Sequence, residues 1–162
     1  MQQTIAGQDA LRMGVLSRSL RVLIAGDHPW IRRSLREDLE AAGIEVCAEA
    51  ETSDGAVRAA LAQRPDLCLL DVRMTDGDGI TAARSIRRSL PDVRIVLITA
   101  LPDERGALAA ARAGADGYLA KDVDRRRLGH IVRVVAEGET TYPRRMLGLI
   151  VRAVQSPDRL EN

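Results

Sequence analysis

Four polar side chains in this 162-residue sequence follow short apolar segments and could together bind and react with an anion. They are Asp27, Asp71, Thr99 and Lys121. Carboxylates are hard oxygen ligands that suit Mg²⁺, an ion that keeps several waters and pairs with phosphate. A carboxylate can also act as a nucleophile and form an aspartyl phosphate. The set therefore predicts a small, metal-assisted anion site.

Each of these residues taken alone has a simpler explanation. An aspartate after a strand often caps the next helix or turn, and threonine is common in strands. Lys121 is the only lysine beside 23 arginines, which by itself has two explanations: sequence drift, or a place where a compact ammonium fits and a wide guanidinium does not. The combination of all four favours chemistry over four separate structural roles. The absence of a Walker loop or a GxGxxG motif gives no indication of a bound nucleotide.

The elements that must position these side chains alternate along the chain. Strands are predicted at residues 22–25, 44–50, 67–71, 93–99 and 117–120. Helices are predicted at residues 29–42, 53–63, 78–90, 102–113, 124–136 and 144–154. Residues 44–50 alternate, but the other strands contain continuous apolar runs, so we expect a parallel sheet covered by helices on both faces. In such a sheet the carboxyl ends of the strands share one edge, where ligands bind, and the four side chains should meet there.

Composition excludes several classes of function. Hydrophobic residues make up 46% and charged residues 29%, as in ordinary globular domains. The net charge of +1 argues against a polybasic arm or an acidic tail as the basis of function. The three aromatic residues are too few for a platform that stacks single-stranded nucleic acid. The apolar runs are too short to span a membrane, and no signal peptide is evident, so a cytoplasmic protein without a membrane partner is expected.

Four stretches, in their order and spacing, resemble the receiver domain of two-component response regulators. They are residues 22–29 (VLIAGDHP), 71–79 (DVRMTDGDG), 96–100 (VLITA) and 114–122 (GADGYLAKD). The resemblance covers about residues 21–136. It implies a flavodoxin-like (β/α)5 fold of the α/β class, with a doubly wound five-stranded parallel sheet in the order 2-1-3-4-5.

The resemblance also implies a role for each site residue. Asp71 would be the phosphoacceptor, with Lys121 beside its carboxylate and Thr99 bonded to the phosphoryl group. The implied ligands of Mg²⁺ are Asp27, Asp71 and the backbone carbonyl of Arg73. Tyr118 would be the switch aromatic, whose side chain changes position when Thr99 moves. Such a domain is not an enzyme toward other molecules and assists only its own phosphorylation and dephosphorylation.

The implied partners are a sensor histidine kinase and a second copy of the chain in a homodimer. Asp122 and the stretches at residues 28–29 and 117–119 are similar to the subclass that carries a LuxR-type helix-turn-helix output. Residues 1–20 are expected to form a leader with a short helix near residues 9–16, and residues 21–137 the receiver domain. Residues 138–162 would form a helix and the start of a linker to an output domain absent from this chain. DNA would be bound only through that output domain, to regulate transcription.

Three positions depart from the family pattern. Gly26 stands where the family has an acid next to Asp27, Thr75 where it has a proline, and Asp122 where a proline usually follows the lysine. The missing acid predicts weak Mg²⁺ binding. It also supports an alternative function, a degenerate receiver that acts as a phosphorylation-independent interaction or ligand-sensing module. A haloacid-type hydrolase is disfavoured because its nucleophile would follow the first strand.

Three further residues carry expectations about packing. Cys47 and Cys68 should not form a disulfide, because the implied strand order places another strand between them, beyond the reach of an S–S bond. Trp30, at the start of a predicted helix, is expected to be partly buried.

Overall fold

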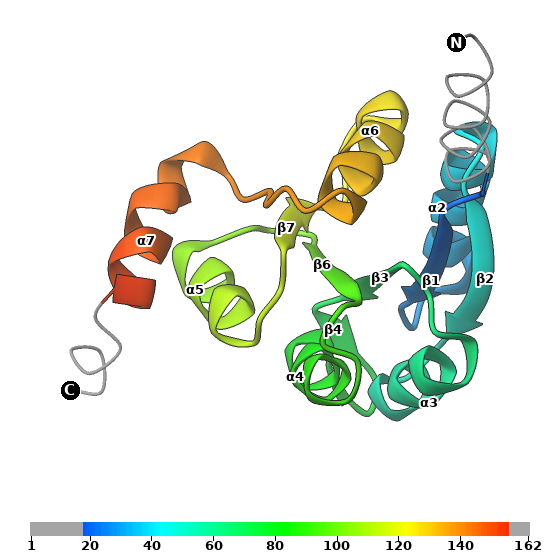
Figure 1. Cartoon of the computed structure of the whole chain (residues 1–162), viewed down its shortest axis with the longest axis horizontal. Helices are drawn as coiled ribbons and strands as arrows, with labels where there is room; N and C mark the ends of the chain where they lie inside the picture. The colour runs from blue at the N-terminus through cyan, green and yellow to red at the C-terminus, as the bar shows by residue number, and fades with distance from the viewer. Residues whose placement is uncertain (1–17, 156–162) are drawn as a thin grey trace, which may run out of the picture.

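The computed structural model describes residues 18–155 and contains a five-stranded parallel sheet (Figure 1). Its strands are β1 (Arg21–Ala25), β2 (Glu45–Ala50), β3 (Leu67–Asp71), β6 (Arg94–Thr99) and β7 (Gly117–Ala120). Their spatial order is β2-β1-β3-β6-β7, and all neighbours are parallel. This is the predicted 2-1-3-4-5 arrangement, so the fold class is confirmed.

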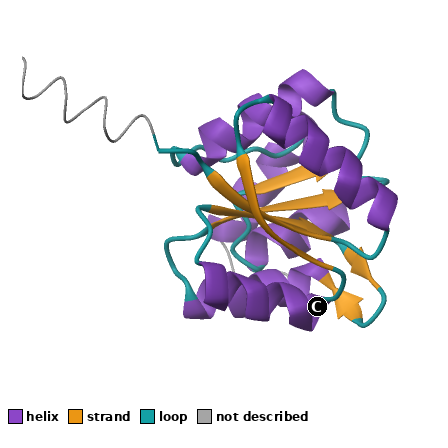
Figure 2. Cartoon of the chain, turned by 90° about the vertical axis from the view of Figure 1, so that its right-hand side faces the viewer, coloured by secondary structure: helices purple, strands orange, loops and turns teal. Residues whose placement is uncertain are grey.

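Helices cover both faces of the sheet (Figure 2). They are α2 (Pro29–Ala41), α3 (Ser53–Gln63), α4 (Gly79–Ser89), α5 (Glu104–Arg112) and α6 (Arg125–Ala136). Alternate side chains of each strand enter two separate cores, one packed against α3, α4 and α5 and the other against α2 and α6. Because both faces are buried, the central strand β3 is apolar at four consecutive positions and ends in Asp71, which is also buried.

Helices α3 to α6 each begin at a side-chain cap, whereas His28 before α2 makes no capping bond. Asp78 and Asp124 cap α4 and α6. The cap of α3 is Thr52, whose hydroxyl accepts from the amide of Gly55, and the next two residues, Ser53 and Asp54, already belong to the helix. All three are good capping types, so sequence does not distinguish them. Helix α5 begins after Asp103, two residues later than predicted.

A short antiparallel hairpin between β3 and α4 was not predicted. It consists of β4 (Arg73–Met74) and β5 (Gly77–Asp78). Asp76 at its tip accepts from the amides of Ser53 and Asp54 at the start of α3, and the first of these bonds is the main cause that lowers the pKa of Asp76. The hairpin is therefore fixed to the neighbouring helix.

After α6 the chain continues into a 3-10 turn, η1 (Arg144–Met146), and then α7 (Leu147–Gln155). These agree with the helix predicted at residues 144–154. Helix α7 lies beside α5 (Figure 1). The predicted helix near residues 9–16 and most of the predicted leader lie outside the described residues. No helix within residues 18–155 is long and apolar enough to cross a membrane.

The prediction for the two cysteines is confirmed, and the one for the tryptophan is not. Cys47 in β2 and Cys68 in β3 are free thiols with β1 between their strands, as predicted. Trp30 is 70% exposed, so the expectation that it is partly buried was wrong. It lies one residue before Ile31, about 100° around α2 from the apolar stripe that faces the core.

Candidate functional site

Asp71 is the last residue of β3 and is only 2% exposed. Its Oδ2 lies 2.5 Å from Nζ of Lys121, which follows β7, two strands away in the sheet. Its Oδ1 accepts a hydrogen bond of 3.0 Å from the amide of Arg73. The strand end thus holds a buried carboxylate in one fixed orientation, paired with the only lysine of the chain.

A small cavity opens beside this ion pair. It has a volume of about 140 Å³ and is lined by Asp71, Arg73, Thr99, Ala100, Leu101 and Lys121. Thr99 ends β6, and its carbonyl accepts from the amide of Lys121 at 2.8 Å. Four of the predicted site residues, Asp71, Arg73, Thr99 and Lys121, therefore line one space that an anion could enter.

Gly79, the first residue of α4, lies in close contact with the backbone of Asp71. A Cβ at this position would lie 2.1 Å from the backbone oxygen of Asp71. The amide of Gly79 also donates to the carbonyl of Val72 at 2.9 Å. Helix α4 can therefore begin directly against the backbone of the acceptor strand only because residue 79 has no side chain.

Asp27 lies at the same edge of the sheet but does not line the cavity. It follows β1, with Gly26 between. Its Oδ2 accepts from the hydroxyl of Thr75 at 3.2 Å, and its Oδ1 is 3.5 Å from Nε2 of His28. Thr75, the residue at the family's proline position, thus ties the β4–β5 hairpin to Asp27.

The candidate metal ligands are of the type that Mg²⁺ prefers, but the chain supplies only a few of them. Asp27, Asp71 and the carbonyl of Arg73 would supply hard oxygen ligands, and waters would complete the coordination. Within residues 18–155, no three histidine, cysteine, aspartate or glutamate side chains lie close enough to hold a metal ion between them. Two carboxylates and one carbonyl are nevertheless a donor set of the kind that Mg²⁺, which keeps several waters, accepts.

Gly26, where the family has an acid, has space for a Cβ. A Cβ at Gly26 would lie 3.4 Å from Cβ and 3.6 Å from Oδ2 of Asp71, which are ordinary contacts. The backbone at Gly26 does not have a positive φ. The backbone and the space around this position therefore allow a Cβ.

A basic residue that the sequence analysis missed lies next to this place. Arg32, in the first turn of α2, donates to the carbonyl of Gly26 at 2.5 Å and to Oε1 of Glu51 at 3.1 Å. Its side chain is only 12% exposed. Among so many arginines nothing in the sequence distinguishes it, because its role depends on the direction in which α2 leaves β1.

Tyr118, the predicted switch residue, is buried in β7 at 2% exposure. Burial raises the pKa of its phenol. Its hydroxyl accepts from the amide of Asp103 at 3.3 Å, and a Cβ at Gly106 would lie only 2.1 Å from that oxygen. The ring is therefore packed tightly beneath the first turn of α5.

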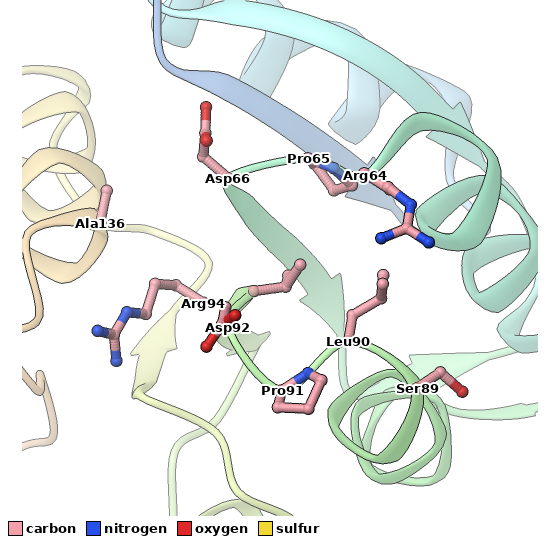
Figure 3. Close-up of a pocket in the computed structure, with 10 residues that line it drawn as sticks. Arg64, Pro65, Asp66, Ser89, Leu90, Pro91, Asp92, Arg94 and Ala136 are labelled. Carbon is pink, nitrogen blue, oxygen red and sulfur yellow. The ribbon is translucent and has the colours of Figure 1, made fainter. Parts of the chain in front are cut away.

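A second pocket, of about 350 Å³, lies at the opposite edge of the sheet (Figure 3). Asp66 and Arg94 contribute to its lining, but none of the predicted site residues does. Asp66 accepts from Arg18 at 3.0 Å and from the amide of Arg21 at 2.9 Å. Arg94 pairs with Asp116 at 3.4 Å. Two of its charged side chains thus already have partners within the chain.

The fold and the site define a class of protein: a doubly wound α/β domain with a lysine-paired aspartate and a threonine at the carboxyl edge of its sheet. A family model described as "Response regulator receiver domain" matches residues 22–133. The chain belongs to the response regulator receiver family.

Similar proteins agree with this assignment. The chain is 34% identical over 127 residues to the DNA-binding transcriptional activator DevR/DosR of Mycobacterium tuberculosis, covering 78% of this chain and 58% of the relative. It is 36% identical over 125 residues to the transcriptional regulatory protein YxjL of Bacillus subtilis, covering 76% and 57%. The crystal structure of a LuxR-family two-component response regulator from Aurantimonas has a TM-score of 0.76 and 28% identity, over 85% of this chain and 99% of that one. The chain spans less than two thirds of the length of the two curated relatives.

Proposed function

We propose that the chain accepts a phosphoryl group on Asp71 from a sensor histidine kinase and so switches an output. The observation that carries this proposal is the buried ion pair between Asp71 and Lys121 at the rim of an anion-sized cavity. A buried carboxylate is costly unless it is paired, and this one is paired by a residue that can equally hold a phosphoryl oxygen.

The residues divide the chemistry between them. A carboxylate oxygen of Asp71 attacks phosphorus as the P–N bond of a phosphohistidine breaks, which yields an acyl phosphate and a free imidazole. Lys121 moves its charge from the carboxylate to the phosphoryl oxygens, and the hydroxyl of Thr99 donates to one of them. Asp27, Asp71 and the carbonyl of Arg73 would hold Mg²⁺, which neutralises charge on the phosphoryl group when bound.

The kinase needs access to Asp71 from outside. A mostly apolar groove of about 550 Å³ lies next to Lys121, between the start of α2 and the loop before α6. The exposed Trp30 contributes to its lining. This groove supports the proposal that the kinase docks here and presents its phosphohistidine.

The output we propose is transcriptional and lies in a domain outside this chain. The names of the relatives DevR/DosR and YxjL support it. Residues 21–137 would act as the receiver domain and residues 138–162 as the connection to the DNA-binding domain. Since helix-turn-helix proteins bind two half-sites as dimers, the proposed active form is a homodimer, acting in the cytoplasm. The domain catalyses only reactions of its own phosphoryl group.

One observation favours a second candidate, a receiver that works without phosphorylation. Gly26 removes one acid from the site, and the guanidinium of Arg32 bonds to the Gly26 carbonyl instead. Fewer acids and a nearby cation both disfavour a divalent ion. A ligand or a partner protein would then replace the phosphoryl group as the signal.

The test is incubation of the full chain with acetyl phosphate and Mg²⁺, followed by intact-mass measurement. The proposal predicts the addition of one phosphoryl group, which is lost when EDTA replaces Mg²⁺. If no mass is added at saturating Mg²⁺, while a typical receiver is modified in parallel, the phosphorylation-independent candidate is favoured instead.

A further inference from the structure

The β4–β5 hairpin carries one hydrogen-bond donor for each of the two acids of the candidate metal site. The backbone amide of Arg73 donates to Oδ1 of Asp71 at 3.0 Å. The hydroxyl of Thr75 donates to Oδ2 of Asp27 at 3.2 Å. Asp27 follows β1 and Asp71 ends β3, and these two strands are neighbours in the sheet. The hairpin therefore joins the two acids and influences how their carboxylates lie relative to each other.

The hairpin is itself fixed to the rest of the domain. Met74 is only 7% exposed and belongs to the core packed against α3, α4 and α5. Asp76 accepts from the amides of Ser53 and Asp54 at 2.8 and 3.3 Å. The hydroxyl of Ser53 donates to the carbonyl of Asp78 at 3.1 Å. The turn that carries the threonine hydroxyl is thus held between the core and the start of α3.

The contact with Thr75 leaves Asp27 able to bind a metal ion. A carboxylate has about four lone-pair positions on its two oxygens, and the hydroxyl uses one of them. The side chain of Asp27 is 25% exposed, so an ion with its waters can reach it. A hydroxyl carries no charge and does not repel a cation. A proline, which the family has at this position, offers no side-chain donor to the acid.

The orientation of Asp27 gains importance because Gly26 supplies no carboxylate. With one acid fewer, the site has less negative charge to attract a divalent ion. Its affinity then depends more on ligands that are already in place, because a ligand that must be ordered on binding loses side-chain freedom. Hydrogen bonds from outside the coordination sphere supply such order, and loss of one typically weakens metal binding by about 10–100-fold.

We propose that Thr75 is a positioning residue for Mg²⁺: its hydroxyl holds the carboxylate of Asp27 in the orientation that binds the ion together with Asp71 and the carbonyl of Arg73. This inference rests on the proposed function, because it assigns a role within the same site. The hairpin contributes to the site twice, through the Arg73 carbonyl as a ligand and through Thr75 as the residue that orients an acid.

The experiment measures the Mg²⁺ affinity of the full chain, without a phosphodonor, from amide chemical shifts during a titration. Thr75→Val replaces the hydroxyl by a methyl group and keeps the branched Cβ, whereas Thr75→Ser keeps the hydroxyl. We expect Thr75→Val to bind Mg²⁺ about tenfold more weakly, the lower end of the loss for such partners. Thr75→Ser should bind as the parent does, which a purely structural role of the methyl group would not produce.

Two further variants separate the orientation of the acid from the attachment of the hairpin. Asp76→Asn weakens the attachment to α3 and keeps the Thr75 hydroxyl, so it should reduce Mg²⁺ affinity less than Thr75→Val does. Thr81→Val makes the same chemical change at the exposed start of α4, where the group bonded to Asp78 is the backbone amide, which the substitution keeps. It should leave Mg²⁺ affinity unchanged. The same spectra show whether each variant is folded.

Three results would overturn the proposal. They are Thr75→Val binding Mg²⁺ as tightly as the parent or more tightly, Thr75→Ser losing as much affinity as Thr75→Val, and a parent chain that binds no Mg²⁺. Mass gain from acetyl phosphate is measured on the same samples at saturating Mg²⁺. A parent that gains a phosphoryl group while Thr75→Val binds Mg²⁺ normally keeps the phosphoacceptor role and loses only the role of Thr75. A parent that binds Mg²⁺ and gains no phosphoryl group overturns the proposed function instead.

Discussion

At the amino edge of the sheet, Asp116 accepts from the amide of Ile95 at 2.9 Å and pairs with Arg87 and Arg94 at 2.8 and 3.4 Å. At the carboxyl edge, Asp71 has one amide and one lysine, and a cavity lies beside it. Both carboxylates are largely buried. Asp116 is surrounded by hydrogen-bond and ion-pair partners, whereas Asp71 borders a cavity through which a new partner can reach it.

The difference shows what separates a structural carboxylate from a reactive one. Asp116 holds the start of β6 and, through Arg87, the end of α4, so its bonds stabilise the fold. Asp71 could give up its lysine to a phosphoryl group without losing a backbone contact. Asp71 and Asp116 both lie at or next to the end of a strand. They differ in how many of their carboxylate lone pairs already accept a hydrogen bond.

The largest effect is expected at Lys121. Lys121→Ala removes the cation that faces the entering charge, and loss of one such preorganised group slows a reaction by about 10²-fold or more. We expect phosphorylation by acetyl phosphate to slow by that amount, measured as the rate of mass gain. Arg125→Ala is the matched control, because Arg125 pairs with Asp38 at 2.7 Å and not with Asp71. Equal rates in parent and Lys121→Ala would remove Lys121 from the site.

A smaller effect, on stability, is expected at the amino edge. In Asp116→Asn an amide NH₂ would face two arginines, so we expect the free energy of unfolding to fall by about 1–3 kcal/mol. Asp71→Asn should lower it less, because the Lys121 side chain is 20% exposed and lines the cavity, so water can solvate its ammonium once the carboxylate is gone. Urea denaturation followed by circular dichroism measures both.

Asp92→Asn serves as the control for this pair, since Asp92 lines the same amino-edge pocket but is exposed. It should leave stability within about 0.5 kcal/mol. A larger loss in Asp71→Asn than in Asp116→Asn would reverse the assignment of structural and reactive carboxylates.

Much of this comparison follows from the sequence. Parallel strands separated by helices bring Asp71, Thr99 and Lys121 to one edge, and the structure places them around one cavity. The resemblance supplied the strand order. Neither source predicted the contacts of Arg32 or Thr75, because these depend on how a helix or a hairpin is directed in space.

The helix caps also depend on backbone geometry that the sequence does not specify. Three consecutive residues, Thr52, Ser53 and Asp54, are all capping types, and only backbone geometry selects Thr52. Trp30 is exposed because it precedes Ile31, and neighbouring positions on α2 point about 100° apart. Residue types and their spacing in the sequence predict the edge of the sheet at which a residue lies better than they predict the neighbours that it contacts.

The smallest expected effect concerns the metal. Gly26→Asp adds a carboxylate next to Asp71, in a place with space for it. We expect Mg²⁺ to bind about tenfold tighter, or ~1–2 kcal/mol, after repulsion between the acids offsets most of the raw attraction. Calorimetric titration measures the affinity.

Gly148→Asp is the matched control, because it adds the same charge on α7 at a position with no atoms within 4 Å of its Cβ. It should leave Mg²⁺ affinity unchanged. If Gly26→Asp binds no more tightly than the parent, Gly26 is not the place of a missing acid. If the parent binds no Mg²⁺ even at tens of millimolar, the phosphorylation-independent candidate gains weight.

The most direct measurement of the central claim is the intact mass of Asp71→Asn and Asp116→Asn, treated side by side with acetyl phosphate and Mg²⁺. We expect Asp116→Asn to gain one phosphoryl group and Asp71→Asn to gain none. A phosphoryl group that still appears on Asp71→Asn would contradict it.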